Sequence, residues 1–331
     1  MCNANAHINA RLHIINFNTY TMVRFLLLFA FIPICLTSIG QDNEKLYKKY
    51  NSLIKKGKKE QAITVMQKIE GNNSKQLFNL LSKVEVFFNE NKLDSAKIYL
   101  SKTVRFQANY SLPVTDDYIK KRNESYKRTI PIVKKIIEND SVSGNFCDLA
   151  VFEHAIGLTR EAIIDFGYAI KFDSTEHIYY YDRAGLYREI NELDSSVADY
   201  TMALKLNPKY PETYLNRGFT YLKMELYEKA IYDLERVQRY TNETSTIAYA
   251  FNNMGYAYYK LGKLELAEQK VNLSINNYPS NSYAYYHLAL IKIEQKDSEK
   301  ACQYIAKSLA LGFTNEYGNE VQQLQEQYCK P

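Results

Sequence analysis

The chain has 331 residues, of which 46% are hydrophobic and 24% are charged, a balance typical of folded rather than disordered proteins. It contains 12 glycines, 7 prolines, 30 tyrosines and no tryptophan, which disfavours a turn-rich all-β fold and favours helices with short connections. The formal net charge of +5 falls to +3 without the first 40 residues, too little to indicate a nucleic-acid-binding protein.

The charge is unevenly distributed along the chain. Residues 41–142 hold 21 Lys/Arg and 12 Asp/Glu, a net of +9, whereas residues 143–331 hold 19 and 25, a net of −6. Drift in the composition of solvated helix faces accounts for this difference. The alternative is that the basic half contacts an anionic surface, either lipid headgroups or the acidic half.

Residues 22–40 have the three-part form of a secretory signal peptide. A single basic residue, Arg24, precedes an apolar run over residues 25–36. Small residues follow at Ser38 and Gly40, the spacing that signal peptidase requires before its cleavage site. The segment therefore predicts an exported protein, periplasmic or associated with the cell envelope.

The apolar run is shorter than the roughly 20 residues that a membrane-spanning helix needs, and Pro33 interrupts it. We therefore expect cleavage before Gln41, with a retained membrane anchor as the alternative. Residues 1–21 are polar and unpatterned, and they separate the signal from the start of the chain. We interpret them as an extension ahead of the true initiator, Met22.

The region after the signal, residues 41–142, is predicted to be helical. Two segments, 43–76 and 77–110, show weak 34-residue periodicity but lack aromatic anchor residues, so each is interpreted as a degenerate helix-pair unit. The residues at the matching places are Gly57 and Ala62 in the first segment and Val84 and Ala96 in the second.

Residues 111–142 match no repeat unit. The pattern over residues 114–138 predicts a helix that is interrupted at Pro131, because proline removes a backbone hydrogen bond and clashes with the preceding turn. We expect this segment to pack as an irregular hinge.

A 34-residue repeat, with one insertion, runs from residue 143 to residue 315. Aromatic anchors recur at Phe146, Tyr180, Tyr214, Phe251 and Tyr285. Small residues follow each anchor after four positions, at Ala150, Ala184, Gly218, Gly255 and Ala289, and after sixteen, at Ala162, Ser196, Ala230, Ala267 and Ala301. A large apolar residue follows after twenty positions, at Phe166, Tyr200, Leu234, Val271 and Ile305.

This spacing has a mechanical explanation. Two antiparallel helices of about a dozen residues and two short turns use about 34 residues, and small residues on both helices let the backbones approach closely. Gly157 and Gly262 fall at the turn between paired helices, where a left-handed backbone is needed. Pro208 and Pro279 fall where the second helix of a unit must end.

These residues resemble the tetratricopeptide repeat family, and HIYYYDRAGLYREINELDSSVADYTMALKLNPKY (177–210) is close to a consensus unit. The resemblance implies an all-α fold, a right-handed α-solenoid of antiparallel helix pairs. The three extra residues at 245–247 are expected in a loop between units. The expected units are 143–176, 177–210, 211–244, 248–281 and 282–315, followed by a capping segment, 316–331, with a helix at 320–328.

No arrangement of residues indicates catalysis. The chain lacks a phosphate-binding glycine loop, a serine-nucleophile elbow and a paired-histidine metal helix. Cys147 and His154 would share a helix face, but about 10 Å apart by helical rise, whereas a thiolate–imidazole pair needs roughly 3 Å. We therefore expect a non-enzymatic protein without a cofactor or a metal.

Cys302 and Cys329 are a candidate disulfide. Cys302 lies on the second helix of the last unit and Cys329 ends the capping helix, and an exported protein occupies a compartment that permits disulfides. The bridge would pin the cap to the last unit and contribute about 3 kcal/mol by the loop-entropy model. Two free, half-buried thiols are the alternative.

The resemblance also implies a concave groove lined by the first helix of each unit. Its positions 2, 5, 6, 9 and 12 are rich in tyrosine and asparagine, which suit recognition of another protein or a peptide. Inter-helix packing or compositional bias is the alternative explanation for any one tyrosine. The candidate groove residues are Tyr181, Arg188, Asn216, Phe219, Tyr249, Asn252, Asn253, Tyr256, Tyr259, Tyr283, Tyr286 and His287.

One subgroup of the family clamps a peptide C-terminal carboxylate with Lys, Asn and Arg side chains. At the corresponding places this chain has Tyr181 and Gly185, then Asn216, then Tyr249 and Asn253, so only Asn216 fits. Clamp function is therefore not expected.

The functional hypothesis is a scaffold or adaptor outside the cytoplasm that binds a peptide or a partner helix in the groove. The alternative is a structural subunit of an envelope or secretion complex that assembles with itself. The expected partner is a protein or peptide; neither nucleic acid nor a small-molecule cofactor is expected, and membrane contact is not predicted.

Overall fold

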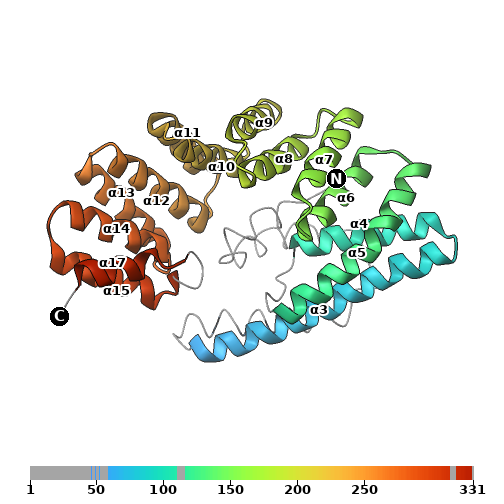
Figure 1. The fold of residues 1–331 in the computed structure, drawn as a ribbon, viewed down its shortest axis with the longest axis horizontal. Helices are drawn as coiled ribbons and strands as arrows, with labels where there is room; N and C mark the ends of the chain where they lie inside the picture. Colours follow the sequence, from blue (N-terminus) through green and yellow to red (C-terminus); the bar gives the residue numbers. More distant parts are fainter. Residues whose placement is uncertain are drawn as a thin grey trace. The chain divides into compact units, whose positions relative to one another are not determined.

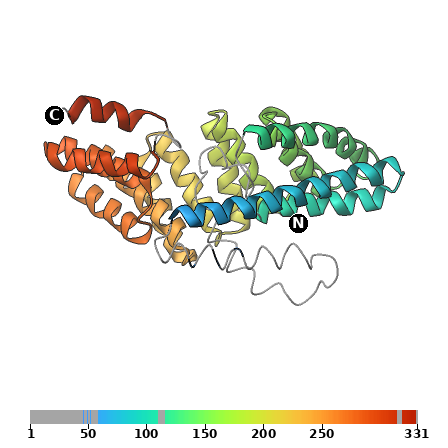
Figure 2. The same ribbon diagram turned by 90° about the horizontal axis from the view of Figure 1, so that it is seen from below.

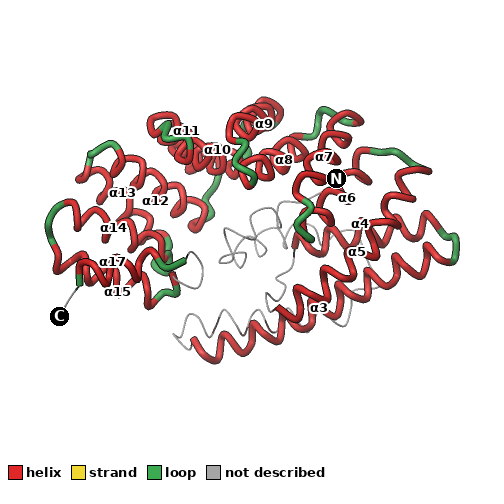
Figure 3. Tube along the Cα trace, viewed as in Figure 1, coloured by secondary structure: helices red, strands yellow, loops and turns green. Residues whose placement is uncertain are grey.

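The computed structural model describes residues 59–109, 116–313 and 318–329, together with the isolated positions 46, 49 and 52. Within these ranges every regular element is an α-helix and no strand occurs (Figure 3). The predicted all-α class and the succession of packed helix pairs are confirmed (Figure 1). The helices in chain order are α3 (Lys59–Asn89), α4 (Leu93–Asn109), α5 (Asp116–Asn139), α6 (Ser143–Ala155), α7 (Thr159–Phe172), α8 (His177–Glu189), α9 (Leu193–Leu206), α10 (Pro211–Lys223), α11 (Tyr227–Tyr240), α12 (Thr244–Lys260), α13 (Leu264–Asn277), α14 (Ser282–Glu294), α15 (Ser298–Ala310) and α17 (Glu320–Tyr328).

The described chain divides into two compact units at Ser174/Thr175. We call the part with α3–α7 the amino-terminal unit and the part with α8–α17 the carboxy-terminal unit. The predicted extension (1–21) and signal peptide (22–40) lie outside the described residues. Among the helices that are described, none is long and apolar enough to cross a membrane.

A left-handed backbone residue closes the turn inside each helix pair. Gly157 and Gly262 have φ values of 89° and 70°, as the sequence predicts for glycines at these turns. The packed helices impose the same conformation where no glycine is present, although it costs a side-chain-bearing residue some strain. These non-glycine residues, with φ values between 59° and 63°, are Asn91, Asn191, Glu225 and Lys296.

The paired helices approach closely at small residues, as predicted. A Cβ atom added to Gly218 would lie 2.9 Å from Leu234 Cγ, closer than such atoms normally approach. A Cβ atom added to Gly255 would overlap Val271 Cγ2 and lie 3.1 Å from the Ala267 carbonyl oxygen. Glycine is therefore needed at these positions of α10 and α12 because the paired helices lie too close together for a side chain. Chain flexibility is not the reason.

In the carboxy-terminal unit, each first helix contacts the first helix of the next pair, in the order α8, α10, α12, α14. Among the described residues, the second helices α9, α11, α13 and α15 make no comparable contacts with one another and pack instead on first helices. Helix pairs stacked in this way curve towards the closer-packed side. The face formed by the first helices is therefore the concave face of this unit.

The predicted boundary between degenerate units 43–76 and 77–110 is wrong, because α3 runs without a break across it. No proline interrupts this stretch, and Gly71 costs a helix only about 1 kcal/mol. A continuous buried stripe along α3 stabilises the long helix, and it consists of Val65, Ile69, Asn73, Leu77, Leu81 and Val84. The second half of α3 and the whole of α4 do form a helix hairpin.

The predicted interruption at Pro131 is also wrong, because α5 continues through it. Pro131 lies on the exposed side of the helix, so water can satisfy the backbone carbonyl that it leaves unpaired. On the opposite side, α5 packs on α6, where the rings of Tyr126 and Phe152 lie 5.0 Å apart. This buried contact stabilises α5 on the side opposite the proline.

The three inserted residues 245–247 were expected to form a loop, and this prediction is wrong. They belong to the first turn of α12. Glu243 caps this turn by accepting hydrogen bonds from the backbone N–H groups of Ser245 and Thr246. The first backbone amides of a helix have no partner within the helix, and the Glu243 carboxylate supplies one here. The cap thereby stabilises a helix that the insertion lengthens at its amino end.

The carboxy-terminal helix α17 spans Glu320–Tyr328, the range expected for a capping helix, and lies beside α15 (Figures 1 and 2). A disulfide joins Cys302 of α15 to Cys329. Beneath α17, the side chains of Val321 and Phe313 are buried against Ile305. The helix therefore covers the apolar end of the last repeat.

Candidate functional site

The twelve candidate groove residues all lie on the first helices α8, α10, α12 and α14 of the carboxy-terminal unit. They fall into two groups that differ in burial. Five are buried: Tyr181, Arg188, Asn216, Asn252 and His287. Seven are half-buried: Phe219, Tyr249, Asn253, Tyr256, Tyr259, Tyr283 and Tyr286.

The first three buried residues form a polar bridge between α8 and α10. Asn216 Nδ2 donates a hydrogen bond of 2.6 Å to the Tyr181 hydroxyl, and Arg188 Nη1 donates one of 3.0 Å to Asn216 Oδ1. The Arg188 guanidinium also lies 5.4 Å from the centre of the Phe219 ring. Burial is the main cause that raises the pKa of Tyr181 well above its usual value, so the phenol stays protonated.

The other two buried residues form an equivalent bridge between α12 and α14. His287 Nδ1 lies 2.9 Å from Asn252 Oδ1, a geometry that fits the tautomer in which the imidazole donates. Burial lowers the pKa of His287 to about 3, so the ring is neutral at physiological pH. Both bridges join position 5 of one repeat to position 6 of the next, and they hold neighbouring first helices together.

The half-buried tyrosines of α12 and α14 form one aromatic surface, which we call the tyrosine cluster: Tyr256, Tyr259, Tyr283 and Tyr286. The ring centres of Tyr256 and Tyr259 lie 6.4 Å apart, and those of Tyr283 and Tyr286 lie 5.5 Å apart. His287 connects the two pairs, with its ring 5.0 Å from Tyr256 and 4.9 Å from Tyr283. Mainly through burial, the pKa of Tyr283 and that of Tyr286 rise to about 12, so these phenols remain neutral hydrogen-bond donors.

Asn253 is the remaining polar candidate and lies at position 6 of its repeat, beside the tyrosine cluster. Unlike Asn216 and His287 at the same position, its side chain has no hydrogen-bond partner among the described residues, and it is half-buried. A carboxamide in this setting can offer both a donor and an acceptor to a bound chain.

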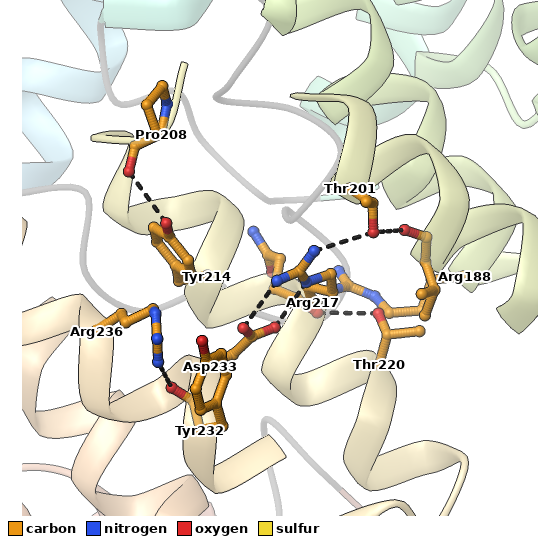
Figure 4. Close-up of polar contacts among 11 residues, drawn as sticks. Arg188, Thr201, Pro208, Tyr214, Arg217, Thr220, Tyr232, Asp233 and Arg236 are labelled. Carbon is orange, nitrogen blue, oxygen red and sulfur yellow. Dashed lines mark hydrogen bonds and ion pairs between the residues drawn. The ribbon is translucent and has the colours of Figure 1, made fainter. Parts of the chain in front are cut away.

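Two partly buried ion pairs, which were not predicted from the sequence, join the first helices α8 and α10 to the second helices α9 and α11. Arg217 donates to both carboxylate oxygens of Asp233 at 2.7 and 2.8 Å and to Thr201 Oγ1 at 2.9 Å (Figure 4). Arg183 and Asp199 form the same two-bonded pair 34 residues earlier, at 2.7 and 2.9 Å. The recurrence of Arg and Asp sixteen residues apart in successive units was the available signal.

The Arg217–Asp233 pair lines an open surface depression between α10 and α11. Because Arg217 and Asp233 neutralise each other there, the depression offers a bidentate pair that is already satisfied and not a free catalytic group. Its lining consists of Arg217, Tyr221, Glu228, Lys229, Tyr232 and Asp233.

Neither Cys147 nor His154, the catalytic candidates of the sequence, lines this depression. Cys147 is fully buried on α6, and His154 lies two helical turns further along the same helix. Within the described ranges, no group of three or more His, Cys, Asp or Glu side chains is arranged to hold a metal ion.

Two family models match parts of the carboxy-terminal unit. Residues 185–225 match a model described as TPR repeat, and residues 211–244 and 282–311 match one described as tetratricopeptide repeat. The chain is 34% identical over 82 residues to the small glutamine-rich tetratricopeptide repeat-containing protein of Dictyostelium discoideum, and 25% identical over 131 residues to tetratricopeptide repeat protein 6 of Homo sapiens. These alignments cover 23% and 40% of this chain and 25% of each relative, so the chain spans about a quarter of their length.

Solved structures with similar folds include MamA (residues 41 to the end) from Desulfovibrio magneticus RS-1, at 18% identity and a TM-score of 0.47 over 52% of this chain and 96% of that one. Another is YrrB, described as a TPR protein with an unusual peptide-binding site, at 17% identity and a TM-score of 0.45 over 58% and 97%. The matching family models, the helix pairs and their left-handed turns together show that residues 185–244 and 282–311 hold tetratricopeptide repeats.

Proposed function

We propose that this protein is a non-catalytic interaction scaffold that binds a peptide or a partner helix on the concave face of its carboxy-terminal unit. Tetratricopeptide repeats generally serve as scaffolds for protein partners. The observation that carries the proposal is the group of half-buried aromatic and amide side chains on α10, α12 and α14, above all the tyrosine cluster and Asn253.

These side chains combine the properties of a recognition surface. Tyrosine provides rigid, amphipathic contact area at a low cost in conformational entropy, and asparagine provides adaptable hydrogen bonds. The buried bridges beneath them, Tyr181–Asn216 and Asn252–His287, fix the helices that carry them. A partner would therefore meet a surface that is already ordered, which reduces the cost of binding.

We further propose that the protein acts outside the cytoplasm, in the periplasm or cell envelope. The form of residues 22–40 supports export, and the Cys302–Cys329 disulfide is of the kind that persists in oxidising compartments. Determination of the amino-terminal sequence of the mature protein tests this part of the proposal. A mature chain that does not begin near Gln41 would contradict it.

A crosslinked pull-down from the native source tests the groove. We expect the double variant Asn253→Ala/Tyr256→Ala to lose most of the partner recovered with the wild-type chain, since both side chains face the proposed ligand and neither takes part in the buried polar bridges. The recovered partner is identified and quantified by mass spectrometry. Circular dichroism establishes that the variant is folded.

A matched control carries the same two types of substitution on second helices. Tyr232, which is 57% exposed on α11, and the exposed Asn272 of α13 are replaced by alanine. This control should recover the partner as the wild type does. If both double variants lose the partner equally, or neither does, the concave face is not the binding surface.

A self-assembling structural subunit remains the second candidate, and one observation favours it. On α7 of the amino-terminal unit, Ile164, Tyr168 and Phe172 form an exposed apolar stripe, with 58%, 44% and 50% of their surfaces accessible. Exposed apolar side chains spaced by one helical turn often mark an interface. Light scattering decides between the candidates, since a concentration-independent monomer excludes self-assembly.

A further inference from the structure

The tyrosine cluster has an ordered underside. On one side, the ring of Phe313 lies 5.3 Å from Tyr283 and 5.0 Å from Tyr286, and Phe313 itself is buried beneath α17. On the other side, the neutral His287 ring packs against Tyr256 at 5.0 Å. Because buried groups support the four phenol rings, their exposed parts present a fixed aromatic surface.

Two exposed carboxylates flank this surface. Glu294 ends α14 and Glu320 begins α17, and neither forms an ion pair with another described residue. Both lie close enough to act on the phenols. After burial, which is the largest cause, Glu294 raises the pKa of Tyr259, and Glu320 contributes to the raised pKa of Tyr286.

Glu320 acts on both Tyr283 and Tyr286. At Tyr259, the charge of Glu294 is a larger cause than the opposing charge of Lys260. An apolar ligand would gain nothing from the two carboxylates, and an acidic ligand would be repelled by them. A cation would be attracted both by the carboxylates and by the faces of the aromatic rings.

We propose that the tyrosine cluster, together with Glu294 and Glu320, binds arginine side chains of an extended peptide. This inference rests on the proposed groove and specifies the chemistry of its ligand. The planar guanidinium stacks on a phenol ring while its N–H groups reach a carboxylate, which the compact ammonium group of lysine does less well.

Fluorescence anisotropy on the full chain tests the inference with defined probes. The probe is a labelled dodecapeptide of alternating arginine and glycine, compared with peptides of the same length that carry lysine or glutamate instead of arginine. We expect the arginine peptide to bind at least about threefold more tightly than the lysine peptide, and the glutamate peptide not to bind.

Two variants remove the two parts of the site separately. Glu294→Gln/Glu320→Gln should weaken binding of the arginine peptide about tenfold, because two charge-assisted contacts are lost. Tyr256→Leu/Tyr286→Leu should weaken it to a similar extent without any change in net charge, because leucine has no aromatic face. Circular dichroism and thermal melts show whether the variants keep the fold.

A matched double variant, Glu299→Gln/Glu326→Gln, removes two exposed carboxylates from α15 and α17 away from the cluster and gives the same net charge. It should bind as the wild type does. Equal losses in the two glutamate variants would mean unspecific attraction to an acidic protein, and unchanged binding in the tyrosine variant would exclude the aromatic surface; either result overturns the inference.

The outcome is separable from that of the groove itself. If the arginine peptide does not bind while Asn253→Ala/Tyr256→Ala still loses the native partner, the groove stands and its preference for arginine is wrong. If the arginine peptide fails and the pull-down is also insensitive to these substitutions, both proposals fall.

Discussion

Three charged side chains from three helices meet inside the amino-terminal unit. Lys134 Nζ of α5 lies 3.0 Å from Glu153 Oε1 of α6, and Asp165 of α7 lies next to Glu153. Burial, and then the neighbouring Glu153 carboxyl group, raise the pKa of Asp165 to about 7, while Lys134 acts in the opposite direction. Asp165 therefore keeps its proton in the folded chain at pH values where a solvent-exposed aspartate has lost it.

This pair predicts that the amino-terminal unit loses stability as the pH rises from about 4 to about 7, the window between the unfolded and folded pKa of Asp165. In that window the folded chain holds a proton that the unfolded chain has released, so each increase in pH favours unfolding. Over this pH range, Asp165→Asn should reduce the fall in the free energy of unfolding by roughly 1–2 kcal/mol, a figure that allows for the partial solvent exposure of the site.

Urea unfolding of both proteins at pH of about 5 and about 7.5, followed by hydrogen exchange of α5–α7, measures this difference. Glu161→Gln, an exposed change on the same helix, serves as the control and should keep the wild-type slope. If Asp165→Asn also keeps the wild-type slope, the raised pKa of Asp165 is not the source of the pH dependence.

At the scale of the helix pair, the distance between α12 and α13 depends on Gly255. Gly255→Ala should destabilise the carboxy-terminal unit by about 2 kcal/mol, because the added methyl group meets Val271 and overpacking outweighs the gain in helix propensity. Thermal denaturation of the purified variant gives the change in the free energy of unfolding.

Gly71→Ala is the matched control, since an added Cβ on α3 has no neighbouring atom within 4 Å. This change should stabilise the chain by about 0.5–1 kcal/mol, the ordinary difference between alanine and glycine in a helix. Similar effects from the two substitutions would show that close packing at Gly255 is not the determining factor.

Helix pairs were predictable where each turn and contact leaves a local signal. The small residues, the turn glycines and the prolines mark both ends of the helices from residue 143 onward, and the structure places them as expected. The amino-terminal unit lacks such marks: the buried stripe of α3 and the exposed position of Pro131 result from packing that no local pattern reports.

The candidate site was predictable only as a set of helix positions. The repeat register gives the face on which Tyr181, Asn216 and His287 lie, but their burial depends on the side chain that the neighbouring repeat presents. Asn216 meets a tyrosine hydroxyl and is buried, whereas Asn253 at the same position meets no hydrogen-bonding partner among the described residues. Such contacts between repeats require the three-dimensional arrangement.

At the scale of the whole molecule, a repeat array differs from a globular core in how far a local loss of stability spreads. Each repeat contacts only its neighbours, so stability is close to a sum of local contributions. A substitution at one end of the carboxy-terminal unit should therefore destabilise the adjacent helices, and its effect on stability should decrease with distance along the array. The disulfide at its end offers a direct test.

Cys302→Ser should release α17 from α15, because the disulfide closes a sequence separation of 27 residues and its loss returns about 3 kcal/mol of chain entropy to the unfolded cap. Hydrogen exchange followed by mass spectrometry should show faster exchange in α17, α15 and α14, and unchanged protection in α3–α7. Reduction of the wild-type chain should reproduce this pattern, since the bond and not the cysteine side chain is responsible.

Ser308→Ala is the control, and it removes a buried hydrogen bond of 2.9 Å to the Ser282 carbonyl within the same repeat. It should accelerate hydrogen exchange in α14 and α15 but leave α17 in place. A uniform acceleration over the entire chain in Cys302→Ser would mean that the molecule unfolds as one cooperative body and that the nearest-neighbour description is wrong for it.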